Sequence, residues 1–208
     1  YGRTFRVTPA TLIPRPETEE LVHSVLREVN NFQSRGEPFS ILDIGTGSGC
    51  IAVTLALELP NTVISAWDIS EKALAVARQN AERLGAKVRF EQQDALNFHS
   101  SLLTSHFSLL VSNPPYVARA EAAAMQPNVL DHEPHLALFV PDEDPLVFYR
   151  AIARMGAEAL VSGGLVFVEI NERFGAETAA VFVENGFASA KVLQDLSGKD
   201  RFVRAVYA

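Results

Sequence analysis

Strand-like apolar runs alternate with amphipathic helical patterns along most of this chain, and this alternation constrains the fold more than any other feature. The strands are expected at residues 40–44, 62–67, 87–92, 107–112 and 165–170. The helices are expected at residues 17–35, 49–58, 70–85, 146–161 and 176–184. Such alternation is typical of an α/β fold with a mostly parallel, doubly wound sheet. Two final strands, 190–193 and 202–207, are too close for a crossover helix, so we expect antiparallel neighbours and a seven-stranded sheet in all.

The first sixteen residues differ from the rest and predict a short arm. Phe5–Thr8 and Thr11–Ile13 flank Pro9 and read as a hairpin or an extended segment. The helix that follows carries an apolar stripe at spacings of three and four. We therefore divide the chain into an arm at 1–16 and one domain at 17–208.

The bulk composition fits a globular domain of 208 residues, of which 48% are hydrophobic. A formal charge of −7 argues against a protein that binds a nucleic acid backbone. Cys50 is the single cysteine, no apolar stretch is long enough to cross a bilayer, and no signal peptide is visible. These features predict a cytoplasmic protein without membrane contacts.

A glycine-rich loop, Asp43–Gly49, joins the first predicted strand to its helix. Ligands of doubly wound sheets bind at the carboxyl ends of strands near the topological switch point. A dinucleotide fingerprint would need glycine where Cys50 stands, so a pyrophosphate ligand and a NAD-linked oxidoreductase are disfavoured. S-adenosylmethionine, which carries no phosphate, is the competing ligand. Its methionine end is expected against the following residues: Asp43, Ile44, Gly45, Thr46 and Gly47.

Two further carboxylates follow predicted strands. Asp68 ends the second strand and is suited to accept hydrogen bonds from two ribose hydroxyls. Asp94 follows the third strand, where its carboxylate would face an adenine amino group, with backbone contact from Ala95. For Asp94 alone, a solvated loop carboxylate is an equally good interpretation.

The motif Asn113-Pro114-Pro115-Tyr116 ends the fourth predicted strand, because neither proline can donate to a sheet ladder. It offers a carboxamide, free backbone carbonyls and an aromatic ring. These groups suit a planar amide or amino group that must be held while its nitrogen reacts. The long irregular segment 117–145 that follows has the character of a lid or binding loop.

The glycine loop, Asp68 and the Asn-Pro-Pro-Tyr motif together resemble class I S-adenosylmethionine-dependent methyltransferases that modify amide or amine nitrogens. Thr11–Glu19, with its Pro-Arg-Pro-Glu-Thr-Glu run, and Glu133–Leu138 are similar to the HemK/PrmC family of protein-(glutamine-N5) methyltransferases. The resemblance covers essentially the whole chain. It implies methylation of the glutamine in the Gly-Gly-Gln motif of peptide chain release factors. It also implies a helical docking domain ahead of the arm, which is expected to be missing from this chain.

This resemblance assigns roles to the motif. Asn113 and Pro114 would accept hydrogen bonds from the substrate amide, Tyr116 would pack on its plane, and Pro115 would complete the substrate contact; Asn113 would also border the cofactor. One departure is Glu169-Ile170-Asn171, where the family has Glu-x-Gly. A nucleic acid amino-methyltransferase acting on adenine N6 or guanine N2 is the alternative, and a catalytically inactive binding module is disfavoured by the intact motifs.

Several other residues receive no functional assignment from the sequence. Cys50 is expected to be structural, and His132 and His135 lack a third ligand, so no metal site is predicted. The roles of Arg15, Glu17 and Glu169 remain open.

Overall fold

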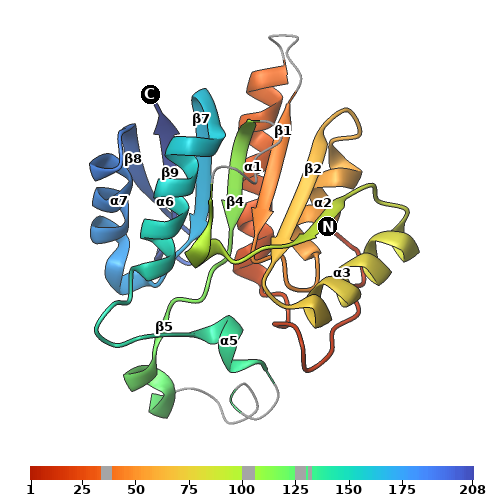
Figure 1. The fold of residues 1–208 in the computed structure, drawn as a ribbon, viewed down its shortest axis with the longest axis horizontal. Helices are drawn as coiled ribbons and strands as arrows, with labels where there is room; N and C mark the ends of the chain where they lie inside the picture. The colour runs from red at the N-terminus through yellow and green to blue at the C-terminus, as the bar shows by residue number, and fades with distance from the viewer. Residues whose placement is uncertain (34–38, 100–105, 125–129, 131–132) are drawn as a thin grey trace.

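The computed structural model describes residues 1–33, 39–99, 106–124, 130 and 133–208. Its main sheet is built from β1 (Ser40–Ile44), β2 (Val63–Asp68), β3 (Arg89–Gln92), β4 (Phe107–Ser112), β7 (Leu160–Glu169), β8 (Phe187–Gln194) and β9 (Asp200–Tyr207). The strand order is β3-β2-β1-β4-β7-β9-β8 (Figure 1). Neighbouring strands pair in parallel except at β9, which is antiparallel to both β7 and β8. The seven-stranded, doubly wound sheet with an antiparallel last strand is therefore confirmed.

The chain reverses its direction of travel across the sheet between β1 and β4. It first moves outward through β2 and β3, then returns to place β4 on the other side of β1. The carboxyl ends of β1 and β4 thus meet at the topological switch point, where doubly wound sheets bind ligands.

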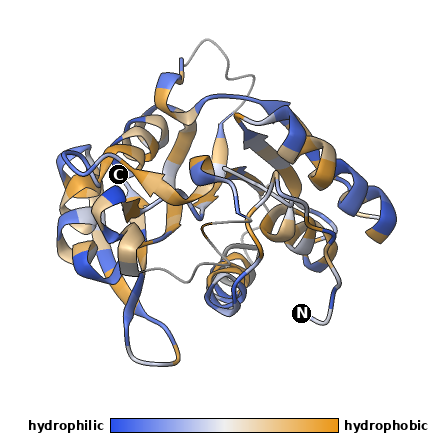
Figure 2. Cartoon of the chain, turned by 90° about the horizontal axis from the view of Figure 1, so that it is seen from below, coloured by the Kyte–Doolittle hydropathy of each residue, from blue (hydrophilic) through white to orange (hydrophobic). Residues whose placement is uncertain are grey.

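Helices cover both faces of the sheet, because its central strands are apolar on both sides. These helices are α1 (Pro16–Gln33), α2 (Cys50–Glu58), α3 (Glu71–Leu84), α6 (Val147–Ala159) and α7 (Gly175–Glu184). One buried cluster joins α1 and α2 to the sheet, and a second joins α6 and α7 to its other face. In a view from below, apolar colours gather along the central strands (Figure 2). Within the described residues, no helix has both the length and the apolar character to cross a membrane.

The helix predicted at residues 70–85 matches α3, and its ends are set by residues next to it in the sequence. The Ser70 hydroxyl accepts a hydrogen bond from the Ala73 amide at 3.2 Å, and Gly85 ends the helix in the left-handed conformation. The fifth strand, by contrast, begins five residues earlier than expected, at Leu160. Gly163 and Gly164, which lie between the predicted helix at 146–161 and the predicted strand at 165–170, are part of β7, because Leu160 pairs with Phe107 and the register then shifts.

The arm takes the extended form rather than the hairpin. Residues 1–15 contain one turn, closed by the Thr11 amide donating to the Thr8 carbonyl at 3.0 Å, and no strand. The backbone amide and carbonyl of Arg6 both bond to the side chain of Asn80 on α3, each at 2.9 Å. This partner on α3 takes the place of a second hairpin strand.

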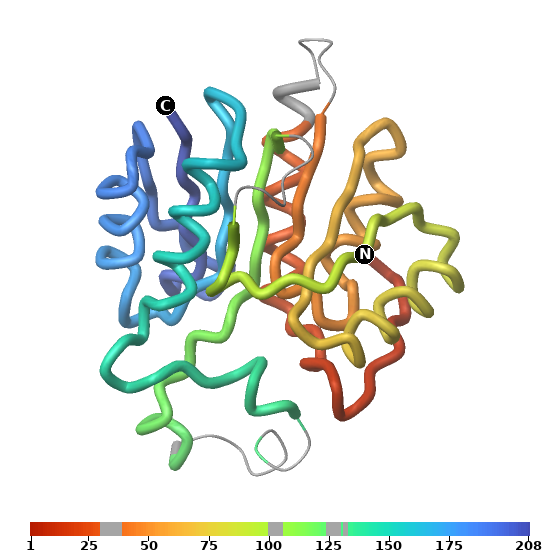
Figure 3. The backbone as a smooth tube through the Cα atoms, viewed as in Figure 1, coloured from red at the N-terminus to blue at the C-terminus, as the bar shows by residue number. Residues whose placement is uncertain are grey.

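The segment after the Asn-Pro-Pro-Tyr motif forms a small substructure below the sheet. It contains β5 (Val117–Ala118), the 3-10 turn η3 (Arg119–Ala124), α5 (His135–Leu138) and β6 (Phe139–Val140), and β5 pairs with β6 in parallel. Figure 3 shows this segment and the arm lying on the same side of the molecule, beneath the carboxyl ends of the parallel strands.

Candidate active site

A cavity of about 410 Å³ opens at the carboxyl ends of β1, β2 and β4. Its floor comes from the glycine loop, Asp68, the turn after β3 and the Asn-Pro-Pro motif. Its other walls come from the arm (Pro9–Leu12 and Pro14), from Pro134, Leu136 and Ala137, and from Phe148 and Ile152 of α6. The arm and the segment after the motif, distant in sequence, therefore close one site.

The glycine loop leaves room for a ligand. Gly45 and Gly47 have φ angles of +72° and +56°, and a Cβ atom built on either would meet nothing within 4 Å. The backbone amides of Gly45 and Thr46 both donate to the Trp67 carbonyl, at 2.8 and 2.9 Å, which ties the loop to the end of β2. Side chains at the two glycines would combine an unfavourable backbone with filling of this space.

Asp68 holds the loop and also faces the cavity. Its Oδ2 accepts from the Gly47 amide at 2.9 Å and its Oδ1 from the Ser70 amide at 2.8 Å. Burial raises the pKa of this carboxyl, while the two amides act in the opposite direction. A carboxylate oxygen has more than one lone pair, so Asp68 can also accept hydrogen bonds from a ligand.

Asp43 lies beneath the loop and is not among the described residues that line the cavity. Its Oδ2 accepts from the Thr46 hydroxyl at 2.6 Å and from the Ala52 amide at 3.2 Å, while Oδ1 has no partner among the described residues. Complete burial raises the pKa of Asp43 to about 7, although its hydrogen bonds lower it. The geometry makes Asp43 a support of the loop, whereas Ile44, Gly45, Thr46 and Gly47 do line the cavity.

Asp94 and Ala95 also line the cavity. The Asp94 side chain caps the short turn η1 (Ala95–Asn97), accepting from the Leu96 amide at 2.9 Å and from the Asn97 side chain at 2.6 Å. The Asp94 side chain therefore stabilises the turn η1, whose first residue, Ala95, lines the cavity.

The Asn-Pro-Pro-Tyr motif divides into two parts. Asn113, Pro114 and Pro115 line the cavity, while Tyr116 is not among the described lining residues. Asn113 Nδ2 donates to the Thr18 hydroxyl at 3.0 Å, and no described residue donates to Asn113 Oδ1. Tyr116 packs against the core cluster that contains α6 and donates its hydroxyl to Glu169 at 3.1 Å.

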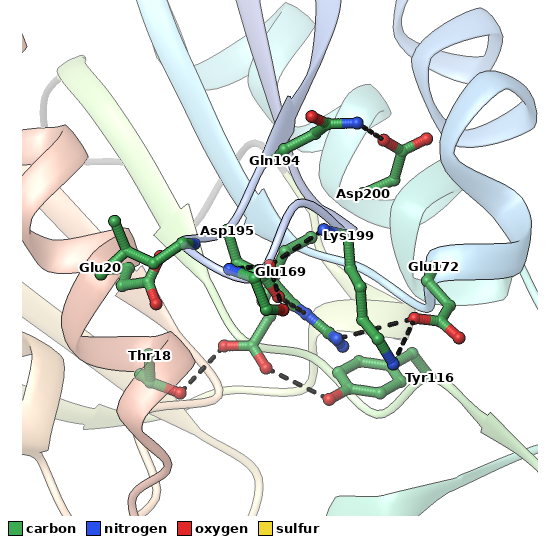
Figure 4. Close-up of polar contacts among 12 residues, drawn as sticks. Thr18, Glu20, Tyr116, Glu169, Glu172, Gln194, Asp195, Lys199 and Asp200 are labelled. Carbon is green, nitrogen blue, oxygen red and sulfur yellow. Dashed lines mark hydrogen bonds and ion pairs between the residues drawn. The ribbon is translucent and has the colours of Figure 1, made fainter.

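Glu169, which sequence reasoning left without a role, is the hub of this part of the site. It ends β7, is only 1% exposed, and accepts hydrogen bonds on both oxygens, from Thr18 at 2.9 Å and from Tyr116 at 3.1 Å (Figure 4). Burial raises the pKa of Glu169, and the Thr18 and Tyr116 hydroxyls act in the opposite direction. Burial, followed by the Glu169 charge, raises the pKa of Tyr116, so its hydroxyl stays a donor. The sequence offered one signal that could have identified Glu169, namely a carboxylate at the end of a core strand beside the switch point.

Asn171, the departure from the family pattern, is accommodated without strain, with φ −68°. Its Nδ2 donates to the Tyr116 carbonyl at 3.3 Å and to Glu121 at 3.1 Å. The side chain that a glycine lacks thus ties the end of β7 to the segment after the motif.

The arm is also fixed to the segment after the motif. Glu133, only 5% exposed, accepts from the Ile13 amide at 3.3 Å and pairs with the Arg15 guanidinium. Arg15 therefore anchors the arm, a role that the sequence left unassigned. The two sequence segments with the most family-specific character are thus in direct contact.

The Cys50 thiol and the two histidines His132 and His135 receive no role in the site. Burial raises the pKa of the Cys50 thiol to about 12, so it is not a ready thiolate. The described residues contain no group of three or more His, Cys, Asp or Glu side chains that could share a metal ion, and His132 lies outside them.

Comparison with known proteins matches residues 26–134 to the family of methyltransferase small domains. The release factor glutamine methyltransferase of Bacteroides thetaiotaomicron is 50% identical over 204 residues, which cover 98% of this chain and 71% of that protein. That of Flavobacterium psychrophilum is 43% identical and covers 98% of this chain and 70% of its own length. The crystal structure of a methyltransferase from Pyrococcus furiosus has a TM-score of 0.67 at 16% identity, covering 99% of this chain and 89% of that one.

Proposed function

Because the chain belongs to the family of release factor glutamine methyltransferases, we propose that this cavity holds a glutamine side chain of a release factor against Asn113 and Pro114. The activity is S-adenosylmethionine-dependent methyl transfer. We assign the acceptor nitrogen to the side-chain amide of the glutamine in the Gly-Gly-Gln motif.

The observation that carries this proposal is the orientation of Asn113. Its Nδ2 is engaged with Thr18 at 3.0 Å, which leaves Oδ1 as an acceptor beside the cavity. A primary amide substrate brings two N–H donors on one nitrogen. Asn113 Oδ1 and the Pro114 carbonyl, to which no described residue donates a hydrogen bond, supply two acceptors for them.

The cavity suits S-adenosylmethionine on three grounds. The open space above Gly45 and Gly47 admits a ligand close to the backbone. Asp68, half-buried and facing the cavity, can accept from ribose hydroxyls, and we expect Asp94 and Ala95, which also line the cavity, to border the adenine. Asp43, which does not line the cavity, supports the loop from beneath, where its Oδ2 accepts from the Thr46 hydroxyl and the Ala52 amide. When bound, this molecule would supply an electrophilic methyl group from its sulfonium, and loss of the sulfur–methyl bond would leave S-adenosylhomocysteine as the product.

The chain's own residues then act by positioning and by electrostatics. An amide nitrogen is a weak nucleophile, because its lone pair is delocalised into the carbonyl. Two fixed acceptors hold the nitrogen and favour the positive charge that develops on it. No residue has to remove a proton beforehand, because a nitrogen that carries this charge loses its proton readily.

Tyr116 contributes through its ring and its fixed hydroxyl. Glu169 holds the hydroxyl at 3.1 Å, so the ring has one orientation. Tyr116 does not itself line the cavity, but it is half-buried and directly follows Pro115, which does, and we assign its ring to the packing on the substrate amide plane. The partner is accordingly a protein, the release factor, and we place the reaction in the cytoplasm without direct nucleic acid binding.

The test is a labelling experiment with S-adenosylmethionine carrying a labelled methyl group, supplied separately with a release factor, DNA and RNA. We expect label on the release factor glutamine, located by mass spectrometry of the peptide. Asn113→Ala should lower kcat roughly 100- to 1000-fold, the range for losing one preorganised polar group, and should leave cofactor affinity nearly unchanged. Asn61→Ala is the matched control, because Asn61 is exposed in the turn before β2.

Label on an exocyclic amine of DNA or RNA, with none on the release factor, would assign the motif to the alternative class of amino-methyltransferases. Wild-type turnover by Asn113→Ala would remove Asn113 from the reaction.

A further inference from the structure

Asn113 is held by a chain of hydrogen bonds that starts outside the Asn-Pro-Pro-Tyr motif. Glu169 accepts from the Thr18 hydroxyl at 2.9 Å, and Thr18 in turn accepts from Asn113 Nδ2 at 3.0 Å. Thr18 and Glu169 are 5% and 1% exposed, so water cannot readily replace either partner. The Glu169 backbone is fixed as well, since its carbonyl accepts from the Tyr149 hydroxyl at 3.2 Å.

The order of donors and acceptors along these two hydrogen bonds determines which way the Asn113 amide faces. An ionised carboxylate only accepts hydrogen bonds, so the single proton of the Thr18 hydroxyl must point at Glu169. The Thr18 oxygen can then only accept from Asn113. The Nδ2 group of Asn113 is the donor, and Oδ1 is left on the side away from Thr18. A side-chain amide without such a neighbour can rotate by half a turn and exchange the two ends.

The other oxygen of Glu169 fixes the aromatic part of the motif. It accepts from the Tyr116 hydroxyl at 3.1 Å (Figure 4). One buried carboxylate therefore orients Tyr116 directly and Asn113 through Thr18.

We propose that Thr18 and Glu169 are positioning residues for methyl transfer: they lock Asn113 with its oxygen as the acceptor and hold the Tyr116 ring. This inference rests on the proposed function for the substrate contact, but the locked amide is a property of the free protein. It also gives a physical role to Thr18 in the Pro-Arg-Pro-Glu-Thr-Glu run, because this residue in the first turn of α1 holds the amide of Asn113.

The first test replaces Thr18. Thr18→Val keeps the shape and removes the acceptor, whereas Thr18→Ser keeps the hydroxyl. Thr178→Val is the matched control, because Thr178 is equally buried and its hydroxyl has no partner among the described residues. We expect Thr18→Val to lower kcat about 10- to 100-fold, the scale of a misplaced reacting group. KM for the release factor and the affinity for S-adenosylmethionine should change far less, and Thr18→Ser should retain most of the turnover.

The second test replaces Glu169. Glu169→Gln has nearly the same shape but carries a donor on one of its two ends, so it cannot accept from Thr18 and Tyr116 together. We expect kcat to fall while the thermal midpoint holds, since the buried charge is also removed. A merely structural role would instead lower the thermal midpoint and kcat together.

NMR of the Asn113 side-chain amide in the free protein supplies a readout that needs no substrate. We expect its two protons to be distinct and slowly exchanging in the wild type and Thr18→Ser, and to lose this protection in Thr18→Val. Unchanged protection in Thr18→Val, or equal kcat in Thr18→Val and wild type, would overturn the positioning role. A wild type that fails to methylate the release factor would instead refute the proposed function and leave the NMR result standing.

Discussion

Asn80 is the buried side chain that links the arm to the glycine loop, and its replacement gives a quantitative test of this architecture. It is 0% exposed on α3 and makes three hydrogen bonds of 2.9 Å. Two of them satisfy the backbone amide and carbonyl of Arg6, and the third is donated to the Ser48 carbonyl in the loop. Asn80→Ala removes all three.

The expected loss of stability depends on whether each former partner of Asn80 stays buried or can bind water. The Ser48 carbonyl is buried, and an unsatisfied buried acceptor costs about 1–3 kcal/mol. The Arg6 groups lie in the arm and can rehydrate, so each of their bonds contributes only about 0.5–1.5 kcal/mol. Asn80→Ala should therefore lower the free energy of unfolding by about 2–6 kcal/mol in all. It should also weaken S-adenosylmethionine binding, because Ser48 belongs to the loop.

Asn80→Asp sharpens the test through its pH dependence. One carboxylate oxygen can still accept from the Arg6 amide, but the other faces the Arg6 and Ser48 carbonyls, to which Asn80 Nδ2 donates. Repulsion and burial raise the pKa of the introduced carboxyl in the folded state above its unfolded value of about 3.9. Its destabilisation is therefore largest at neutral pH. It lessens as the pH falls through the folded pKa, and the relief is complete below the unfolded value.

Urea denaturation followed by circular dichroism at several pH values measures both effects, with Asn61→Ala as the exposed control. Asn80→Asp should be less stable than Asn80→Ala at pH 7, and the gap should narrow toward pH 4. A loss below about 0.5 kcal/mol in Asn80→Ala, or a gap that does not narrow with acid, would refute the bridging role of Asn80.

Two further predictions concern the cavity walls. Asp68→Ala loses the acceptor for the Gly47 amide and for the ribose, so the Kd for S-adenosylmethionine should rise about 10- to 100-fold, as for one or two hydrogen bonds to a charged group. Fluorescence of Trp67, the single tryptophan and a cavity residue, reports this binding, and an unchanged Kd would contradict the assignment. Cys50 borders the cavity, but the pKa of its thiol is raised to about 12, so iodoacetamide at pH 8 should label it slowly in the native protein and completely in urea. Rapid native labelling would be inconsistent with the raised pKa of the thiol.

Elements with local signals were predictable from the sequence, and those set by tertiary pairing were not. The ends of α3 are fixed by Ser70 and Gly85, which act within one turn of the chain. The start of β7 depends on Leu160 pairing with Phe107 in β4, and no pattern near Leu160 encodes that partner. The arm stays extended because Asn80, distant in sequence, occupies the Arg6 backbone.

The candidate site divides in the same way. The glycine loop, Asp68 and the Asn-Pro-Pro part of the motif line the cavity, because each follows a strand whose carboxyl end points to one edge. Asp43 lies near the end of β1, where it is buried beneath the loop and does not line the cavity. Thr18 and Glu169 are 151 residues apart and become partners only when α1 packs beside β7. No spacing rule connects them.

This division bears on what a short motif can specify. Asn-Pro-Pro-Tyr supplies an amide that has an acceptor at one end and a donor at the other, and the motif itself does not choose between them. The choice is made by Thr18, which can only accept because Glu169 takes its proton. A site that binds a substrate N–H pair needs the acceptor end inward, so the chemistry of the motif depends on a helix and a strand outside it. Thr18→Val and Glu169→Gln should therefore lower turnover although the motif itself is intact, and neither residue is assigned a contact with the reacting nitrogen.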